Sequence, residues 1–327
     1  MKVLHITNLY PSIEKPDYGI FVKEQIKSIQ ENEEVQCDVF HIPADKYGAK
    51  AYVKAIVELR KNYQDYDLYH SHHLFSGFVS VLANRKVKKI VSLLSSGFDV
   101  EPHSKLSYVA PIIYCLVCFF TDRLITKVPR RNSVFSRKFI YMPNGVDEAV
   151  FSQQDRSIAR KKLGINESAF VPLFVSSKSL NRTEKRKDLF DELISRLKSE
   201  NKQLLIEPLY MCNVDRELIP LYFNAADVHV LLSDYEGSPN SVKEALSCGC
   251  PVIASNVGDI PELLNNITNA KMISQKEYKD KSTLSFLIHC HRLSFEERSE
   301  IRKGFLAKKL IKSRVSAQII DLYRELT

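Results

Sequence analysis

The sequence predicts an α/β protein with two doubly wound parallel-sheet domains that face a cleft. The chain has 327 residues, which is too long for one ordinary core and suits two domains of roughly 150 residues each. Short apolar runs alternate with longer segments of helical period, which is the pattern of parallel strands joined by crossover helices. This alternation stops after Asn144 and Gly145 and starts again near residue 170. The pause predicts a domain boundary.

The first half carries one complete run of this alternation. A helix is expected at 106–120, with the sequence LSYVAPIIYCLVCFF. It is shorter than the ~20 residues of a membrane-spanning helix, and Pro111 interrupts it, so we expect a buried helix there. The remaining strands are expected at 3–7, 37–42, 67–71, 89–94, 123–127 and 139–143, and the remaining helices at 21–30, 49–63 and 74–84.

The second half begins with a polar segment that runs through Lys162 and that we interpret as a linker. Apolar Val315, Ile319 and Leu322 recur at helical spacing near the end of the chain and predict a docked helix. Strands are expected at 170–177, 203–208, 227–233 and 251–255, and helices at 187–198, 215–224 and 239–247. The expected domains are residues 1–155 and 165–309, with a helix in 310–327 that returns to the first domain.

Composition indicates a folded protein of a reducing compartment. Apolar residues make up 44% and charged residues 26% of the chain, which is ordinary for a globular protein. Seven scattered cysteines do not form a disulfide framework in a chain of this length. The start MKVLHITNLYP has too short an apolar run for a signal peptide and reads as a first strand. A cytoplasmic location is expected.

Positive charge is concentrated in residues 85–138. The whole chain carries a net charge of +8, and this segment holds eleven Lys or Arg residues against three acidic ones. A basic, partly apolar face suits an anionic membrane leaflet, where each surface cation contributes about 1 kcal/mol. Nucleic acid is the competing partner, but the sequence has no zinc finger, RNP motif or basic heptad helix. We expect peripheral membrane contact and no nucleic acid.

The stretch DYEGSPNSVKEALSCGCPVIAS, residues 234–255, predicts a ligand site. Its Glu236 follows the strand expected at 227–233, and ligands of open α/β sheets bind at the carboxyl ends of strands. Ser238 and Pro239 suit an N-cap and the first residue of a helix. Gly249 can take the left-handed position that ends this helix.

The chemistry of this stretch suits a sugar nucleotide. Free N–H groups around Asn240, Ser241 and Val242, together with the helix dipole, predict an anion site. Carboxylates accept hydrogen bonds from vicinal hydroxyls, so Glu236 and Glu244 on either side of it can hold a sugar and a ribose. Each glutamate alone is more often an idle surface residue. The combination at a strand end favours the site.

The longer stretch DYEGSPNSVKEALSCGCPVIASNVGDIPELL resembles the donor-site signature of family-four retaining glycosyltransferases of the GT-B fold. That signature is glutamate, seven residues, glutamate, then Ala-Leu-x-x-Gly-x-Pro-Val and Gly-x-x-Pro-Glu. YGIFVKEQIKSI, DLYHSHHLFSG and YMPNGVDEAVF resemble other elements of the family more loosely. The resemblance implies two Rossmann-like domains, the first binding the acceptor and the second the nucleotide sugar, with a C-terminal helix docking across.

The resemblance also implies roles for single residues. Glu244 would bind the nucleotide ribose and Glu236 the transferred sugar. Gly19 would let the first loop approach the diphosphate closely, as glycine does where backbone nears a ligand. Backbone N–H groups would add contacts to phosphate or sugar from Gly237, Ser238, Asn240, Ser241 and Val242.

An arginine and a lysine on the phosphates are also implied. Arg182 is the matching arginine, but the usual Lys-Gly pair is absent, so Lys185 and Lys187 both stay open. Without the resemblance, such a charged run reads as a solvated helix start.

Histidines form a second group of candidates at a strand end. His72 is interpreted either as a contact to donor sugar or acceptor, or as a packing and capping residue, and His70 as structural. Ser96-Gly97-Phe98-Asp99 stands where many relatives read His-Gly-x-Asp, so any role of that histidine is lost or moved. Cys115 and Cys118 have no second pair at zinc spacing and indicate core packing.

Together these features predict a retaining hexosyltransferase that uses a nucleotide-diphosphate sugar, with UDP favoured, and no cofactor. No Asp-x-Asp stands at a plausible strand end to hold a metal, so the cations and the helix N-terminus would stabilise the leaving diphosphate. The basic segment favours a lipid-linked glycan acceptor at the inner face of the plasma membrane, as in surface-polysaccharide synthesis. A sugar-nucleotide 2-epimerase and a catalytically inactive binding or scaffold subunit are the alternatives.

Overall fold

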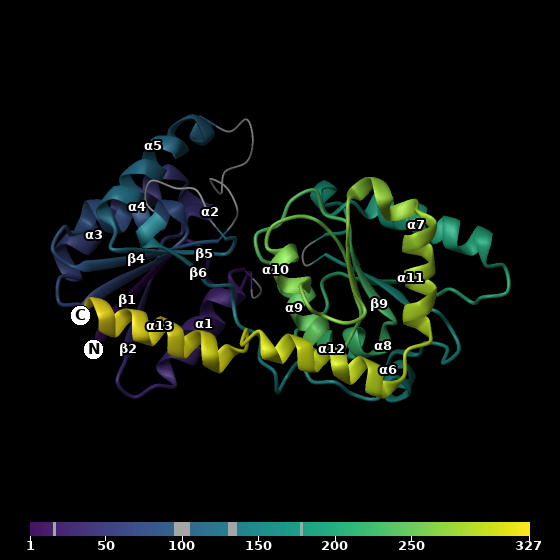
Figure 1. Ribbon diagram of the computed structural model, residues 1–327. Helices are drawn as coiled ribbons and strands as arrows, with labels where there is room; N and C mark the ends of the chain where they lie inside the picture. Colours follow the sequence, from purple (N-terminus) through teal and green to yellow (C-terminus); the bar gives the residue numbers. More distant parts are fainter. Residues whose placement is uncertain (16–17, 95–104, 130–135, 177–178) are drawn as a thin grey trace. The chain divides into compact units, whose positions relative to one another are not determined.

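The computed structural model describes residues 1–15, 18–94, 105–129, 136–176 and 179–327. It divides into two compact units, unit 1 with Met1–Gly145 and Lys312–Thr327, and unit 2 with Val146–Ile311. Each unit holds one sheet in which all paired strands are parallel. Helices cover both faces of these sheets (Figure 1). The predicted α/β class with two doubly wound parallel sheets is confirmed.

Unit 1 is built on a six-stranded sheet of order β2-β1-β3-β4-β5-β6. The strands are β1 Lys2–Thr7, β2 Gln36–His41, β3 Leu68–His72, β4 Lys88–Leu93, β5 Arg123–Thr126 and β6 Phe139–Tyr141. The helices are α1 Ile20–Gln30, α2 Ala44–Tyr47, α3 Ala49–Asn62, α4 Leu74–Ala83, α5 Lys105–Phe120 and α13 Lys312–Leu326, with a 3-10 turn at Ser136–Lys138.

Successive strand residues face opposite helix layers in unit 1. Val3 and Leu68 pack with Val22 of α1 and Ile319 of α13. The next residues along the strands, such as Leu4, pack against α3 and α4 instead. Val315, Ile319 and Leu322 are buried, as their spacing predicts.

The α5 helix differs from its expected burial. Val117 and Cys118 pack inward, but Ile112 and Phe119 are 63% and 64% exposed. The expectation of a buried helix therefore holds for one side of α5 and is wrong for the other, because α5 packs on the unit through one side only. Within the described ranges, no helix is long and apolar enough to cross a membrane.

Unit 2 is built on a five-stranded sheet of order β11-β10-β9-β7-β8. The strands are β7 Pro172–Val175, β8 Leu209–Met211, β9 Val228–Leu231, β10 Val252–Ser255 and β11 Ala270–Ile273. The helices are α6 Arg156–Leu163, α7 Lys187–Glu200, α8 Ile219–Ala225, α9 Asn240–Ser247, α10 Ile260–Leu264, α11 Lys281–His291 and α12 Phe295–Ala307, with 3-10 turns at η2 Thr183–Lys185 and η3 Gln275–Lys279.

The strand expected at 203–208 is wrong. Ile206 makes an isolated bridge to Phe170, and regular pairing begins at Leu209 opposite Leu173. Pro208 lies between them and has no N–H to continue the ladder, so the paired strand starts after it.

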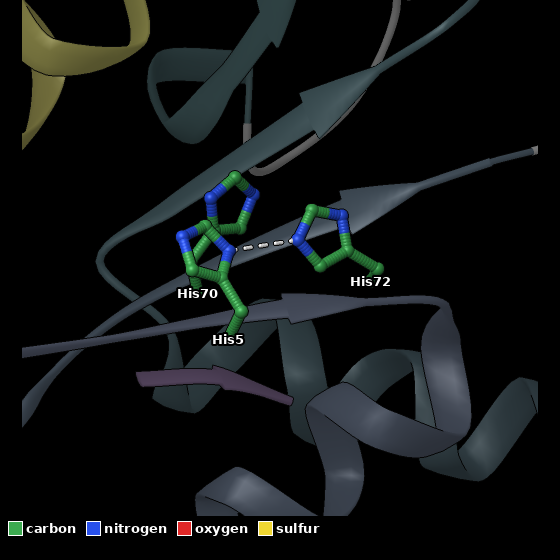
Figure 2. A group of neighbouring side chains, drawn as sticks. All are labelled: His5, His70 and His72. Carbon is green, nitrogen blue, oxygen red and sulfur yellow. Dashed lines mark hydrogen bonds between the residues drawn. The ribbon is translucent and has the colours of Figure 1, made fainter. Parts of the chain in front are cut away.

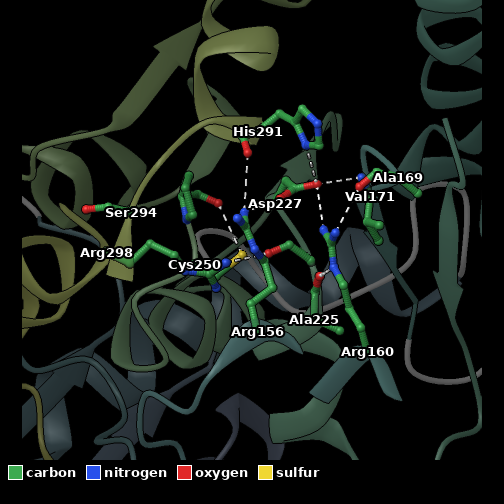
Figure 3. A network of polar contacts seen from close by, with 12 residues as sticks. Arg156, Arg160, Ala169, Val171, Ala225, Asp227, Cys250, His291, Ser294 and Arg298 are labelled. Carbon is green, nitrogen blue, oxygen red and sulfur yellow. Dashed lines mark hydrogen bonds and ion pairs between the residues drawn. The ribbon is translucent and has the colours of Figure 1, made fainter. Parts of the chain in front are cut away.

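The polar segment interpreted as a linker contains α6, and an ionic network ties this helix to the sheet (Figure 3). Asp227, which directly precedes β9, is fully buried. It accepts hydrogen bonds from Arg156 at 2.5 Å, Arg160 at 2.8 Å and the Val171 N–H at 2.7 Å, and His291 Nδ1 lies 3.2 Å away. The network fixes the amino end of β9, whose other end leads to the candidate site.

Candidate functional site

The loop that follows β9 presents Glu236 to a lysine from a neighbouring part of the sheet edge. Lys185 Nζ lies 2.5 Å from Glu236 Oε1, and the two side chains are 15% and 14% exposed. Ser233 Oγ donates to the same carboxylate oxygen at 2.8 Å. Lys185 ends η2, in the connection from β7 to α7, and β7 and β9 are adjacent. Lys185 and Glu236 thus follow the carboxyl ends of two neighbouring strands. Open α/β sheets bind ligands at this edge.

A second loop, after β10, contacts the Glu236 loop. The Asp259 N–H donates to the Gly237 carbonyl at 3.0 Å. Gly258 has φ of +60°, and a Cβ there would lie 2.2 Å from the same carbonyl oxygen. A side chain at Gly258 would therefore push the loop away as well as strain its own backbone.

The start of α9 differs from the expected capping. The helix begins at Asn240, and Pro239 with φ −67° and ψ 116° occupies the N-cap position. Ser238 therefore stands one residue before the cap, out of reach of the first-turn amides, and the prediction of a Ser238 cap is wrong. Its Oγ is buried and has no hydrogen-bond partner among the described residues. A buried hydroxyl without a partner at a helix N-terminus is a ready contact for a ligand oxygen.

Within α9, Glu244 is 6% exposed, and Arg216 Nη1 donates to its Oε1 at 2.8 Å. Arg216 lies between β8 and α8, and its guanidinium stands 5.0 Å from the centre of the Phe151 ring. Arg216 is not predicted from the sequence, because it lies outside the motif and in a segment expected to be helical. The pair gives Glu244 a fixed orientation.

The other predicted α9 residues support the helix. Ser241 Oγ lies 3.2 Å from Nε2 of the buried His229 on β9, while Val242 is part of the core. Burial lowers the pKa of Lys243 to about 8, against the opposing effects of Asp259 and Glu244. Gly249 has φ of +70° after the helix end, as predicted.

The two other predicted cations point to acidic neighbours of their own. Arg182 Nε donates to Glu184 Oε1 at 2.6 Å. Lys187 Nζ donates to Asp191 on α7 at 2.5 Å and stands 4.9 Å from the Tyr210 ring centre. Of the two lysines left open by the sequence, Lys185 is the one that contacts Glu236.

In unit 1, Gly19 precedes α1 with φ of +73°, and a Cβ would lie 2.4 Å from the Leu9 carbonyl oxygen. The loop after β1 therefore packs directly on the start of α1. This close packing accounts for a glycine at position 19.

The predicted His72 belongs to a buried histidine cluster (Figure 2). His5 Nδ1 and His72 Nε2 are 3.0 Å apart, and His70 contacts Tyr323 at 2.5 Å and Ser92 at 2.8 Å. Desolvation lowers the pKa of His5 to about 3 and the pKa values of His70 and His72 well below 6.5. These rings are held neutral in the fold, which supports the packing interpretation of His72.

The same cluster has the spacing of metal ligands, with three ring nitrogens within 4.8 Å of one another. Both nitrogens of His70 are already hydrogen-bonded. The His70 and His72 rings stack at 4.4 Å between centroids instead of pointing at a common centre. We assign no metal to this cluster. Ser96-Gly97-Phe98-Asp99 lies outside the described residues.

The sequence is similar to those of known glycosyltransferases. Residues 186–282 match the family model "Glycosyl transferases group 1". The chain is 25% identical over 268 residues to D-inositol 3-phosphate glycosyltransferase of Geodermatophilus obscurus, covering 66% of this chain and 57% of that protein. It is 24% identical over 329 residues to the putative teichuronic acid biosynthesis glycosyltransferase TuaC of Bacillus subtilis, covering 80% and 83%.

Among solved structures, the chain resembles Anabaena HepE in complex with UDP-glucose, with a TM-score of 0.70, 15% identity and coverage of 99% and 100%. At this identity the likeness shows a shared fold. The chain spans a little over half the length of the inositol phosphate relative.

Proposed function

From a glycosyl transferase group 1 domain at residues 186–282 and a GT-B fold, we propose that the chain is a retaining glycosyltransferase. It moves a sugar from a nucleotide-diphosphate sugar, with UDP favoured, to a lipid-linked glycan acceptor in surface-polysaccharide or glycoconjugate synthesis. The observation that carries this proposal is the contact of Lys185 with Glu236 beside the start of α9. The solved complex of HepE with UDP-glucose supports the choice of UDP.

Each group at this edge has a task in the proposal. Glu236 accepts hydrogen bonds from hydroxyls of the transferred sugar, and Glu244, oriented by Arg216, accepts them from the ribose. Lys185, Arg182 and the N–H groups at the start of α9 face the diphosphate. The Ser238 hydroxyl, which has no partner among the described residues, donates to a phosphate or sugar oxygen.

In the proposed reaction, the bond from the anomeric carbon to the diphosphate oxygen breaks, and the acceptor oxygen bonds to the same face of that carbon. The acceptor proton goes to the departing diphosphate. Negative charge grows on the diphosphate as it leaves, and preorganised donors are worth roughly 2.7–4 kcal/mol each by deletion. Glu236 faces the positive charge that develops on the sugar.

Transfer without a metal is part of the proposal. Lys185, Arg182 and the α9 N-terminus provide positive potential where a metal would otherwise neutralise the diphosphate. The test is transfer in the presence of EDTA. Full activity in EDTA is expected, and activity lost in EDTA but restored by magnesium would contradict it.

Contact with an anionic membrane through residues 85–138 is also proposed. The exposed side of α5 carries Ile112, Leu116, Phe119 and Phe120, which follow each other at helical spacing. Nearby, Lys138 Nζ binds the carbonyls of Phe119 and Thr121 at the end of this helix. An apolar stripe with surrounding cations suits an interfacial helix. Salt-sensitive binding to anionic vesicles tests this, and absence of binding at low salt contradicts it.

The function itself is tested by incubating the protein with radiolabelled UDP-, GDP- and ADP-sugars and a lipid extract of bacterial membranes. Label in the lipid fraction that depends on both donor and extract is the expected result. Conversion of the donor without any acceptor would favour the sugar-nucleotide 2-epimerase. Donor binding with neither conversion nor transfer would favour the inactive scaffold.

A further inference from the structure

Unit 1 contains a groove that the proposed function has not used. It runs along α3 from the carboxyl end of β2 and has a volume of about 860 Å³. Phe40, Ile42, Ala51 and Ala55 form its floor, and all four are buried. The floor is therefore apolar, and the two alanines keep it open along one helix. The volume falls in the range of small-molecule sites.

Lysines line the rim of this groove. Lys50 and Lys54 are four residues apart on α3, which places them on one side of that helix, and Lys46 lies on the preceding short helix α2. Lys46 pairs with Glu14 at 3.1 Å. Lys50 and Lys54 are exposed and have no ion pair or hydrogen bond within the part of the chain that the structure describes. Glu58 is the acidic residue of the lining, so the rim carries excess positive charge.

The groove lies at the ligand-binding edge of the unit 1 sheet. It begins where β2 ends, and the Ile42 N–H donates to the Thr7 carbonyl at the end of β1. Lys15, in the loop between β1 and Gly19, pairs with Asp45 of α2 at 2.6 Å. The groove is thus a direct neighbour of the loop that Gly19 ends.

We propose that this groove binds the lipid phosphate of the acceptor, an inference that rests on the proposed function. A single isoprenoid chain lies on the apolar floor, and its phosphate meets Lys50 and Lys54 at the rim. Charge complementarity between a phosphate and the two exposed lysines, Lys50 and Lys54, places the phosphate end of the ligand at the rim.

The test measures binding of farnesyl phosphate to the full chain by titration calorimetry. The variant Lys50→Glu/Lys54→Glu changes only exposed side chains, so folding is expected to be retained. The control Lys61→Glu/Lys202→Glu makes the same change of net charge at exposed residues that are not part of the groove lining. We expect the groove variant to bind at least tenfold more weakly and the control to bind like the wild type. Farnesol and inorganic phosphate should each bind weakly, because farnesol has no phosphate for Lys50 and Lys54 and inorganic phosphate has no apolar chain for the floor.

Equal binding of farnesyl phosphate by wild type and groove variant would overturn the inference. So would a groove variant that loses binding to anionic phospholipid vesicles but keeps binding to farnesyl phosphate, because the groove would then be a membrane contact. A UDP titration of the melting temperature is run on the same proteins. An unchanged UDP response alongside equal lipid binding would remove the groove assignment alone, whereas no UDP response in any protein would count against the proposed function.

Discussion

Lys185 and Glu236 are 51 residues apart in the sequence, yet Nζ and Oε1 meet at 2.5 Å at the carboxyl edge of the unit 2 sheet. The contact joins the connection after β7 to the loop after β9. It places a cation and a carboxylate where the proposed reaction needs one group for the diphosphate and one for the sugar.

Replacing Lys185 with methionine should lower kcat about 10²- to 10³-fold, because one preorganised donor to the leaving group is removed. Lys187→Met is the matched comparison, since Lys187 pairs with Asp191 on α7 instead. Its kcat should change by less than about threefold, well within the effect of losing an exposed ion pair. Initial rates with saturating donor check both. Loss of activity in Lys187→Met with retention in Lys185→Met would reverse the assignment.

Gly258→Ala should displace the Glu236 loop and weaken nucleotide-sugar binding. The new Cβ meets the Gly237 carbonyl, and such overpacking costs about 1–3 kcal/mol. Gly164→Ala controls for backbone strain, because Gly164 has φ of +69° but nothing within 4 Å of its Cβ position. Urea unfolding and UDP binding are measured on both. Equal effects of the two substitutions would show that the close contact is unimportant.

Asp227→Asn should destabilise unit 2 by about 3–5 kcal/mol, because the buried Arg160 would lose its counter-charge. Asp321→Asn removes an exposed partner of Arg324 and should cost only about 0–1 kcal/mol. Both values come from urea unfolding curves. A cost below 1 kcal/mol for Asp227→Asn would contradict the anchoring role of the network.

Unit 1 should lose stability as the pH falls below about 6.5. His5, His70 and His72 have depressed pKa values in the fold, so the unfolded chain binds their protons first. Their contribution is complete above pH 6.5 and falls by about 1.4 kcal/mol per pH unit for each histidine as the pH decreases. For His5 this continues down to a pKa of about 3.

The check is the free energy of unfolding between pH 7 and pH 4.5 for wild type and His5→Asn. The free energy of unfolding of the variant should change less steeply with pH, by about the 1.4 kcal/mol per pH unit that one histidine contributes. The same substitution at the exposed His289 is the control. An unchanged slope in His5→Asn would mean that the ring is not held neutral.

The sequence predicts best what is local. The strand, turn and helix around residues 228–249 follow from adjacent apolar, proline and glycine residues, and the structure has each of them. The helix begins one residue later than predicted, because Pro239 has an extended backbone with ψ of 116° and occupies the N-cap position. Ser238 therefore lies outside the cap.

Contacts made by the tertiary fold could not be predicted. Arg216 reaches Glu244 from another strand connection, and no spacing in the sequence links the two. The exposed side of α5 reads as apolar core, because hydropathy does not say which neighbours a helix has. The buried histidines were visible in the sequence as a strand-end pattern, but their contacts to His5 and Tyr323 were not.

The proposed function requires a nucleotide diphosphate to bind at Glu244 beside the start of α9. Its most direct test is the melting temperature of the wild type and of Glu244→Gln, titrated with UDP in EDTA. We expect UDP to raise the melting temperature of the wild type by binding linkage, and Glu244→Gln to need at least tenfold more UDP for the same rise. If the melting temperature of the wild type responds to no nucleotide diphosphate, whether UDP, GDP or ADP, the site at Glu244 does not bind a nucleotide and the proposed function is wrong.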